Sequence, residues 1–228
     1  MTQALLLDAL GTLVELPAPG PALREELAER FGLRVSEAQA SAALVAEIAF
    51  YRRHFDLARD PESLAALRGR CAEVLREALP PSPRLAALGT PELTAALLGA
   101  LRFAPYPDAL PAIRAARERG LRVVVASNWD VSLPDVLRRV GLAPVLDGVV
   151  TSAAAGERKP GGAVFRRALE LAGGVSPAAA VHVGDSPEED VVGAHAAGLR
   201  AILIRREGGP GPPGVPTIER LSELSGLL

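Results

Sequence analysis

The apolar residues of this chain follow two different rhythms. A short apolar run at residues 4–8 predicts a buried strand that ends in a carboxylate. Over residues 22–101 apolar side chains instead recur every three or four positions, as in the series Leu23, Leu27 and Phe31. This second spacing predicts helices throughout that part of the chain.

Beyond residue 105 apolar runs and helical patterns alternate. Short apolar strands are predicted at residues 121–126, 148–151, 179–183 and 201–204. Helices are predicted between and around them, at residues 109–119, 132–140, 162–172, 188–197 and 218–227, the last with Thr217 as its N-cap. Strands that are apolar throughout and alternate with helices are typical of a parallel sheet covered on both faces.

The helical stretch begins after the first strand and ends before the next helix of the alternating part. We therefore expect an α/β fold whose core is a doubly wound parallel (Rossmann-like) sheet built from residues 1–16 and 102–228. Residues 17–101 are expected to form an inserted all-helical domain. The Pro/Gly-rich stretch at residues 17–21 is expected to be the linker that leads into it.

Composition and charge exclude several classes of partner. The formal net charge of the 228 residues is −2, and the arginines are scattered among acidic residues, which argues against nucleic-acid binding. No apolar run approaches the roughly 18–20 residues of a membrane span, and no basic segment precedes an apolar one, so no secretory signal is expected. The single cysteine, Cys71, cannot form an internal disulfide, and a cytoplasmic location is the natural expectation.

One basic residue is set apart from the others. Of the 25 Lys and Arg residues, 24 are Arg, and the only lysine is Lys159. Lysine is a compact point charge, whereas arginine is a wide planar fork, so the two are not interchangeable in a confined site. The lone lysine is either a functional residue or a chance survivor of a compositional drift toward arginine.

Polar side chains follow four of the predicted strands. Asp8 ends the first strand, Ser127 and Asn128 follow the second, Lys159 lies beyond the third, and Asp185 follows the fourth. Ligands of open α/β sheets bind outside the carboxyl ends of the strands, so we expect these residues at one rim. Taken singly, each also has a purely structural explanation as a turn or helix-capping residue.

The chemistry of this set is coherent. Two carboxylates with few other ligands suit a hard, octahedral cation such as Mg²⁺. Asp8 could attack an electrophile and form a covalent intermediate. The oxygens of a transferring phosphoryl group could be held by Ser127, Lys159 and the backbone amides of the Gly11-Thr12 turn.

Four short motifs occur in order along the chain: DALGTL beginning at Asp8, SN at Ser127, KP at Lys159 and GDSPEED at Gly184. As an ordered set they identify the chain as a member of the haloacid dehalogenase-like (HAD) hydrolase superfamily. The subgroup that it resembles has a helical cap inserted after the first strand. The resemblance covers essentially the whole chain and implies a hydrolase.

The resemblance implies a role for each motif residue. Asp8 would be the nucleophile that becomes an aspartyl ester, and Lys159 would neutralise both Asp8 and the phosphoryl oxygens. The phosphate-binding residues would be Gly11, Thr12, Ser127, Asn128 and Lys159. Mg²⁺ would be held by Asp8, Asp185, Asp190 and the backbone carbonyl of Leu10.

Leu10 departs from the pattern of the phosphatases that this chain resembles. They usually carry a second aspartate there, which protonates the leaving group and later activates water. Leucine can do neither, and losing a positioned general acid–base typically costs a factor of about 10²–10⁴ in rate. We therefore expect a Mg²⁺-dependent phosphohydrolase that is slow on poor leaving groups.

Other relatives leave further alternatives open. The 2-haloacid dehalogenases also have a nonacidic residue at the position of Leu10, but they use Ser and Asn around the fourth motif and need no metal. Phosphonoacetaldehyde hydrolases use a cap lysine for a Schiff base, and residues 17–101 contain no lysine, which excludes the ordinary version of that mechanism. A non-catalytic homologue that only binds phosphate is a third possibility.

Residues outside the motifs complete the expectation. Arg52 and Arg53, in the predicted cap, could meet the anionic tail of a substrate or could be solvated surface charges. His182 lies inside a predicted strand and is expected to be a core histidine rather than a catalytic one. The expected partner is a small anionic, phosphorylated substrate, and the expected assembly is a monomer or a homodimer.

Overall fold

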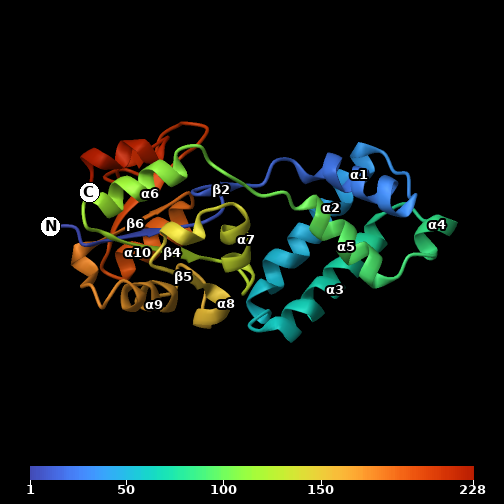
Figure 1. The fold of residues 1–228 in the computed structure, drawn as a ribbon, viewed down its shortest axis with the longest axis horizontal. Helices are drawn as coiled ribbons and strands as arrows, with labels where there is room; N and C mark the ends of the chain where they lie inside the picture. Colours follow the sequence, from blue (N-terminus) through green and yellow to red (C-terminus); the bar gives the residue numbers. More distant parts are fainter. The chain divides into compact units, whose positions relative to one another are not determined.

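The computed structural model describes residues 1–228 and divides the chain into two compact units (Figure 1). One unit, the α/β unit, comprises Met1–Glu15 and Ala104–Leu228, and the other, the helical unit, comprises Leu16–Phe103. None of the helices is both long enough and apolar enough to cross a lipid bilayer.

The α/β unit is built on a six-stranded sheet with the order β5-β4-β1-β6-β7-β8. All neighbouring strands of this sheet are parallel. The strands are β1 (Ala4–Leu7), β4 (Arg122–Ser127), β5 (Gly148–Thr151), β6 (Ala180–Gly184), β7 (Arg200–Ile204) and β8 (Thr217–Ile218). The first strand is therefore central, which explains why it is completely buried.

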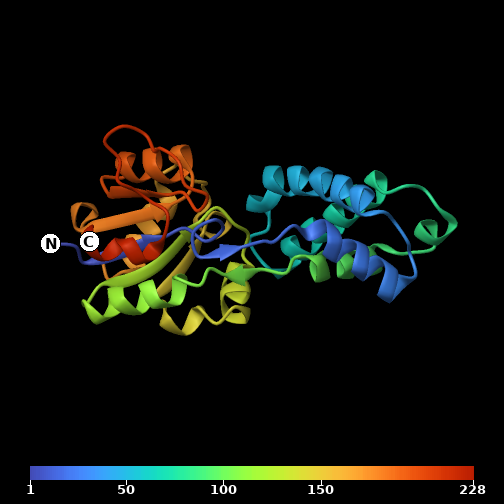
Figure 2. The same ribbon diagram turned by 90° about the horizontal axis from the view of Figure 1, so that it is seen from above.

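Helices cover both faces of this sheet, as Figures 1 and 2 show. Besides short 3₁₀ turns, the helices of this unit are α6 (Ala109–Glu118), α7 (Leu133–Arg139), α8 (Ser152–Ala155), α9 (Ala163–Leu171), the π-helix η4 (Pro187–Val192) and α10 (Gly193–Ala196). Leu6 of β1 belongs to one apolar cluster with Phe165 of α9 and Ala194 of α10. Leu5 and Leu7 point to the opposite face because successive strand side chains alternate. The α/β fold predicted from the alternating pattern is confirmed.

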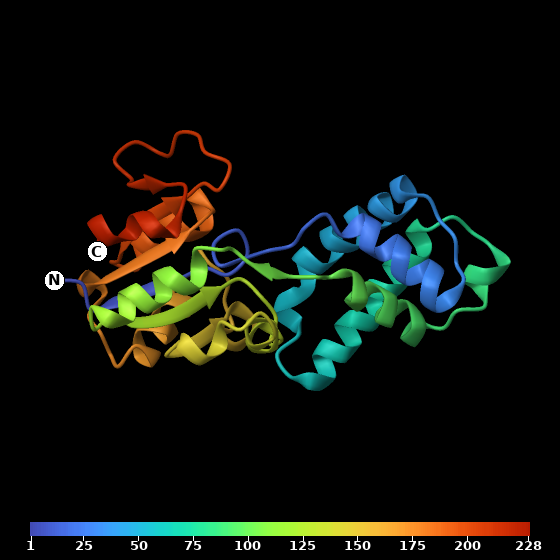
Figure 3. The same cartoon turned by 45° about the horizontal axis from the view of Figure 1, so that its top comes forward.

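The helical unit contains five helices, α1 (Pro19–Phe31), α2 (Glu37–His54), α3 (Pro61–Ala78), α4 (Pro83–Ala86) and α5 (Thr90–Ala100). Figure 3 shows α1, α2, α3 and α5 packed side by side, in agreement with the contacts between them. Two helix starts carry a reciprocal capping box, Ser36 with Gln39 and Asp60 with Ser63. Such caps satisfy backbone N–H groups that have no partner within the helix.

A second, very small sheet lies where the chain leaves and re-enters the α/β unit. Strand β2 (Val14–Glu15) pairs antiparallel with β3 (Ala104–Pro105). Tyr106 then donates its backbone N–H to the carbonyl of Leu13 at 2.9 Å. The segment that follows the first strand and the segment that returns from the helical unit are thus tied together.

Two local predictions were wrong. The stretch at residues 17–21 was expected to be a linker, but α1 begins at Pro19, because proline fits the first turn of a helix, where no N–H partner is needed. The final helix was expected at residues 218–227 with Thr217 as its N-cap. Instead, Thr217 and Ile218 form β8 beside β7, and only a 3₁₀ helix, Leu221–Gly226, follows.

The apolar cluster behind the sheet should dominate the stability of the α/β unit. Phe165→Ala removes the largest fully buried side chain and should lower the free energy of unfolding by about 3–5 kcal/mol. Leu171→Ala in the same helix is the matched control, since Leu171 is partly exposed and should cost under about 1 kcal/mol. Urea denaturation followed by circular dichroism measures both, and equal losses would contradict this view of the core.

Candidate active site

Two strand ends, one loop and the π-helix η4 bring charged side chains together at the carboxyl edge of the sheet. Asp8 directly follows β1 and Asp185 directly follows β6, which are neighbouring parallel strands. The ammonium of Lys159, in the loop beyond α8, lies 2.7 Å from Asp8 Oδ1 and 2.5 Å from Asp190 Oδ1. Lys159, Asp8 and Asp190 are all buried, so the lone lysine of the chain joins two buried carboxylates.

Asn128 holds the backbone of Lys159 in place. Its side-chain Nδ2 donates to the carbonyl of Lys159 at 3.0 Å, and its Oδ1 accepts the amide N–H of Lys159 at 2.8 Å. Both ends of the Asn128 amide therefore serve to position the lysine. Ser127, the last residue of β4, is buried immediately before it.

Asp190 is fixed by donors on both of its oxygens. Oδ1 accepts from Lys159 and from Nε2 of His182 at 2.8 Å, and Oδ2 accepts the amide N–H of Ser186 at 2.9 Å. The carboxylate packs directly on Gly184, where a Cβ atom would lie only 2.1 Å from Asp190 Cγ. The glycine of the fourth motif is therefore needed for this close approach.

The loop after Asp8 is wound tightly around one carbonyl. The amides of Thr12, Leu13 and Val14 all donate to the carbonyl of Ala9. Gly11 adopts φ = +77°, a left-handed conformation that favours glycine. A Cβ on Gly11 would lie 2.3 Å from Asp185 Oδ2, so glycine at this position leaves room for the Asp185 carboxylate of the fourth motif.

Leu10 and Thr12 of this loop differ in exposure. The Leu10 side chain is 37% exposed and offers no acidic or basic group. Thr12 is completely buried, and its Oγ1 has no hydrogen-bond partner in the structure. Position 10, where the related phosphatases carry an acid–base side chain, therefore has only a hydrocarbon side chain in this protein.

The site concentrates negative charge. Asp8, Asp185 and Asp190 each offer an oxygen within 4.8 Å of the others, while the Lys159 ammonium pairs with Asp8 and Asp190. Burial raises the pKa of the Asp8 carboxyl; the Lys159 ammonium opposes this rise, and the Asp190 carboxylate adds to it. Desolvation, followed by the charges of Asp8 and Asp190, raises the pKa of Asp185 to about 7, although its side chain reaches solvent.

Lys159 and Asp190 remain charged in this setting. Burial alone would lower the pKa of Lys159, but the carboxylates of Asp8 and Asp190 outweigh it and raise the pKa above its ordinary value. Burial would likewise raise the pKa of Asp190, but Lys159 and His182 bring it well below its ordinary range. An additional cation at the cluster would favour the ionised forms of Asp8 and Asp185 in the same way.

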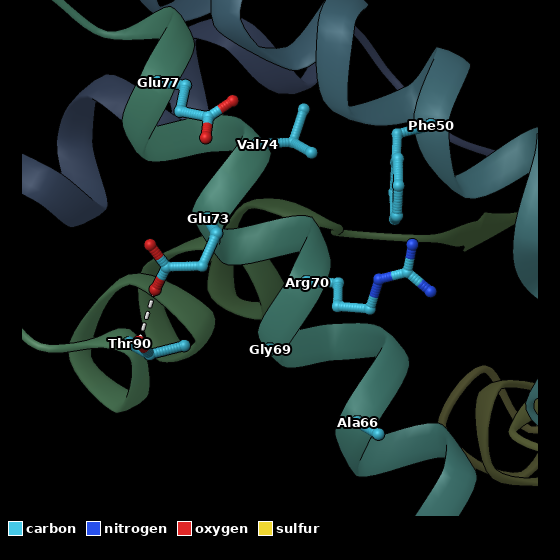
Figure 4. Close-up of a pocket in the computed structure, with 8 residues that line it drawn as sticks. All are labelled: Phe50, Ala66, Gly69, Arg70, Glu73, Val74, Glu77 and Thr90. Carbon is cyan, nitrogen blue, oxygen red and sulfur yellow. Dashed lines mark hydrogen bonds between the residues drawn. The ribbon is translucent and has the colours of Figure 1, made fainter.

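The predicted binding residue Arg52 belongs to the helical unit. It lies in the last turn of α2 and its side chain is exposed, so its role in substrate binding stays a prediction. The same unit has a depression of about 390 Å³, shown in Figure 4, in which the guanidinium of Arg70 lies 5.0 Å from the ring centre of Phe50 and Glu73 is bonded to Thr90. It contains no cluster of chemistry-bearing groups comparable to the carboxyl edge of the sheet.

Sequence reasoning missed one residue that supports the Asp8 loop. Arg206, just beyond β7, donates from Nη2 to the carbonyl of Thr12 and pairs through Nη1 with Asp108 at 2.6 Å. Its guanidinium lies 3.9 Å from the ring centre of Tyr106. No motif or periodicity marks Arg206, because its partners lie far from it along the chain.

The family assignment follows from this fold and site. The family model for haloacid dehalogenase-like hydrolases matches residues 2–198, and the chain belongs to this family of hydrolases. The family predicted from the ordered motifs is confirmed.

Related proteins include named phosphatases. A bovine haloacid dehalogenase-like hydrolase domain-containing protein 3 is 43% identical over 122 residues, which cover 51% of this chain and 47% of that protein. The chain thus spans about half the length of that relative. Phosphoserine phosphatase of Thermus thermophilus is 36% identical over 173 residues, covering 72% of this chain and 66% of that enzyme.

Solved structures share the fold over nearly the whole chain. A HAD phosphatase from Thermococcus onnurineus superposes with a TM-score of 0.69 at 25% identity, covering 99% of this chain and 97% of that one. A 2-haloacid dehalogenase from Pseudomonas syringae pv. Tomato has a TM-score of 0.69 at 26% identity, covering 100% and 98%. The relatives and structural neighbours of this chain thus include both named phosphatases and a 2-haloacid dehalogenase.

The raised pKa of Asp185 predicts that replacing this residue by asparagine stabilises the folded protein, by an amount that depends on pH. Because the folded-state pKa, about 7, exceeds the ordinary value of 3.8, metal-free stability should fall as pH rises between these values. Asp185→Asn should therefore raise the melting temperature of the metal-free protein at pH 8. Solvent screening limits the gain to about 1 kcal/mol, or roughly 2–4 °C.

Differential scanning fluorimetry in EDTA at two pH values measures this effect. At pH 5.5 the difference between variant and wild type should be roughly half of that at pH 8, because the unfolded chain has already lost the proton there while folded Asp185 still holds it. A variant that is less stable than wild type at pH 8 would show that the Asp185 carboxylate is not repelled by Asp8 and Asp190.

Proposed function

We propose that the protein is a Mg²⁺-dependent phosphohydrolase that acts through an aspartyl-phosphate on Asp8. The observation that carries the proposal is the ion network in which Lys159 lies within 2.7 Å of Asp8 and is anchored by Asp190, while Asp185 remains at the same edge. Its phosphatase relatives support the choice of phosphoryl transfer.

Asp8 is suited to be the nucleophile because Lys159 holds its Oδ1 while 10% of its side-chain surface remains exposed. In the first step a carboxylate oxygen of Asp8 bonds to phosphorus, and the bond from phosphorus to the leaving oxygen breaks. In the second step water attacks the same phosphorus, inorganic phosphate leaves, and Asp8 regains its carboxylate. The Lys159 ammonium stabilises the negative charge on the phosphoryl oxygens in both steps.

The acidic cluster fits a hard divalent cation. Three carboxylates lie close together, and burial, followed by the charges of Asp8 and Asp190, raises the pKa of Asp185 to about 7. Oxygen ligands of this kind are those that Mg²⁺ takes up together with water. Asp8, Asp185 and the backbone carbonyl of Leu10 would hold the ion, with Asp190 sharing it or orienting the site. When bound, Mg²⁺ would offset the carboxylate charges and polarise a phosphoryl oxygen.

Leu10 determines which phosphorylated substrates are favoured. No acid at this position can protonate a leaving group, so leaving groups that depart without a proton should suffer least. The leaving group of an acyl phosphate is a stable carboxylate, whereas the leaving group of a sugar phosphate is an alkoxide that requires protonation. The substrate class that fits this chain best is therefore a small, anionic, activated phosphate.

The helical unit is proposed to act as a cap that selects the substrate, with Arg52 as a contact for an anionic tail. Two relatives are named phosphoserine phosphatase and glyceraldehyde 3-phosphate phosphatase, after small phosphorylated compounds. These names support a small phosphorylated substrate for this chain.

Turnover of acetyl phosphate should be measurable with Mg²⁺ and lost with EDTA, while sugar phosphates should be hydrolysed slower by a factor of about 10²–10⁴, the usual value of a positioned acid. Release of inorganic phosphate measures both rates. Equal and fast hydrolysis of the two substrate types would contradict the role assigned to Leu10.

Leu10→Asp should restore the missing acid–base group. Its rate on a sugar phosphate should rise by about 10²-fold or more, while acetyl phosphate hydrolysis changes much less. Leu10→Asn is the matched control, because it adds a polar side chain of the same size that cannot transfer a proton. If both variants gained equally, polarity rather than proton transfer would explain the effect.

Hydrolysis of 2-haloacids is the second candidate, because Leu10 is nonacidic and a 2-haloacid dehalogenase shares the fold at 26% identity. Against it stands Asp185, which keeps a carboxylate in the acidic cluster. Chloride release from 2-chloropropionate without added metal would favour dehalogenation. Strict Mg²⁺ dependence of all turnover would exclude it in favour of phosphoryl transfer.

A further inference from the structure

His182 is a buried polar residue in the middle of an otherwise apolar strand. It lies at the centre of β6, is 0% exposed, and stands opposite Leu6 of the central strand. A valine or leucine would suit this strand position without any cost of burying an imidazole. The side chain therefore needs an explanation beyond packing.

The contacts of His182 lead directly to the site. Its Nε2 lies 2.8 Å from Asp190 Oδ1, the same oxygen that accepts from Lys159 at 2.5 Å. Its ring meets that of Phe165 edge-on at 5.0 Å between centroids, which orients the imidazole. The chain of contacts thus runs from His182 through Asp190 and Lys159 to Asp8.

The hydrogen-bonding pattern defines the direction of each bond. The Asp190 carboxylate can only accept, so Nε2 of His182 carries the proton and donates. Nδ1 is buried and has no hydrogen-bond partner. An unprotonated nitrogen is better tolerated in such a place than an unpaired N–H, so the neutral form with its proton on Nε2 fits this environment.

We propose that His182 is a positioning residue that fixes the Asp190 carboxylate and thereby holds the Lys159 ammonium against Asp8. With the amide of Ser186 on the other oxygen, the imidazole locks the carboxylate from two sides. Without this bond, Asp190 Oδ1 would have only Lys159 as a side-chain donor, and the ammonium would be shared less favourably with Asp8. The effect on rate rests on the proposed function, whereas the effect on Lys159 does not.

A shape-matched pair of substitutions tests the donor separately from the packing. His182→Phe keeps a ring against Phe165 but removes the N–H, and His182→Gln keeps an N–H near the position of Nε2. The Phe variant should lose about 10- to 100-fold in kcat for acetyl phosphate, as outer-shell substitutions typically do, with little change in KM. The kcat of the Gln variant should remain within about 3-fold of wild type, well below the loss expected for the Phe variant.

The unequal effect on kcat and KM separates positioning from a general loss of folded protein. If the Phe variant does not fold, His182→Leu provides the same loss of the donor with a smaller side chain. Wild-type kcat in a folded donor-less variant would overturn the proposal. An equal loss in the Gln and Phe variants would also overturn it, because packing alone would then explain the rate.

The single lysine provides a second readout that does not depend on activity. With ¹⁵N-labelled lysine, the only lysine ammonium signal in the spectrum belongs to Lys159. In wild type its protons should exchange slowly with water, because the group is buried and bonded to two carboxylates. Exchange should be about tenfold faster or more in the Phe variant, the lower end of an outer-shell effect, and should return toward wild type in the Gln variant.

Together, the measurements of kcat and of Lys159 proton exchange test the positioning role of His182 separately from the proposed function. If wild type hydrolyses no phosphate ester but the Lys159 signal responds as expected, the positioning role stands and the proposed function falls. If wild type hydrolyses acetyl phosphate while the Phe variant leaves both kcat and the Lys159 signal unchanged, the proposed function stands and the positioning role falls.

Discussion

The rest of the site depends on one buried ammonium shared between two carboxylates. Isolating a charge inside a protein is costly unless it is paired and hydrogen-bonded, and Lys159 meets this condition only if Asp8 and Asp190 both reach it. That requirement constrains the fold. The first strand must lie beside β6, the loop beyond β5 must return across β4, and Asn128 must hold that loop by its backbone.

The same network explains how the site balances charge and chemistry. A third carboxylate, Asp185, lies within reach of the pair but has no ammonium of its own, and burial together with the charges of Asp8 and Asp190 raises its pKa to about 7. When ionised, the three carboxylates exceed the one ammonium by two negative charges, a condition that suits a divalent cation and an anionic substrate together. Leu10 leaves this electrostatic machinery in place and removes only the proton-transfer group. Under the proposed function, nucleophilic attack and charge stabilisation would be separated from acid–base catalysis in this chain.

Much of the fold was predictable because local pattern and tertiary environment agree. Apolar runs became the buried strands β1, β4, β5, β6 and β7, and the polar residue after each of several strands reached one edge, as the parallel arrangement requires. Prediction failed where a long-range contact overrides local preference: Thr217 is a good N-cap, yet its segment pairs with β7 instead. His182 was recognised as a core histidine, but nothing in the sequence shows that the pleat of β6 turns its ring toward Asp190. Arg206 could not be found at all, since its partners Thr12 and Asp108 are distant along the chain.

The central claim is that Asp8 becomes phosphorylated and that the residue at position 10 cannot assist the hydrolysis of that bond. Attack by Asp8 on an acyl phosphate needs no proton donor, whereas the later attack by water does benefit from a base, so the covalent species should accumulate. The most direct measurement is intact-mass and peptide mass spectrometry of the protein quenched in acid during turnover of acetyl phosphate with Mg²⁺. The account predicts one added phosphoryl group on the peptide that contains Asp8. Turnover without any adduct, or an adduct on another residue, would contradict it.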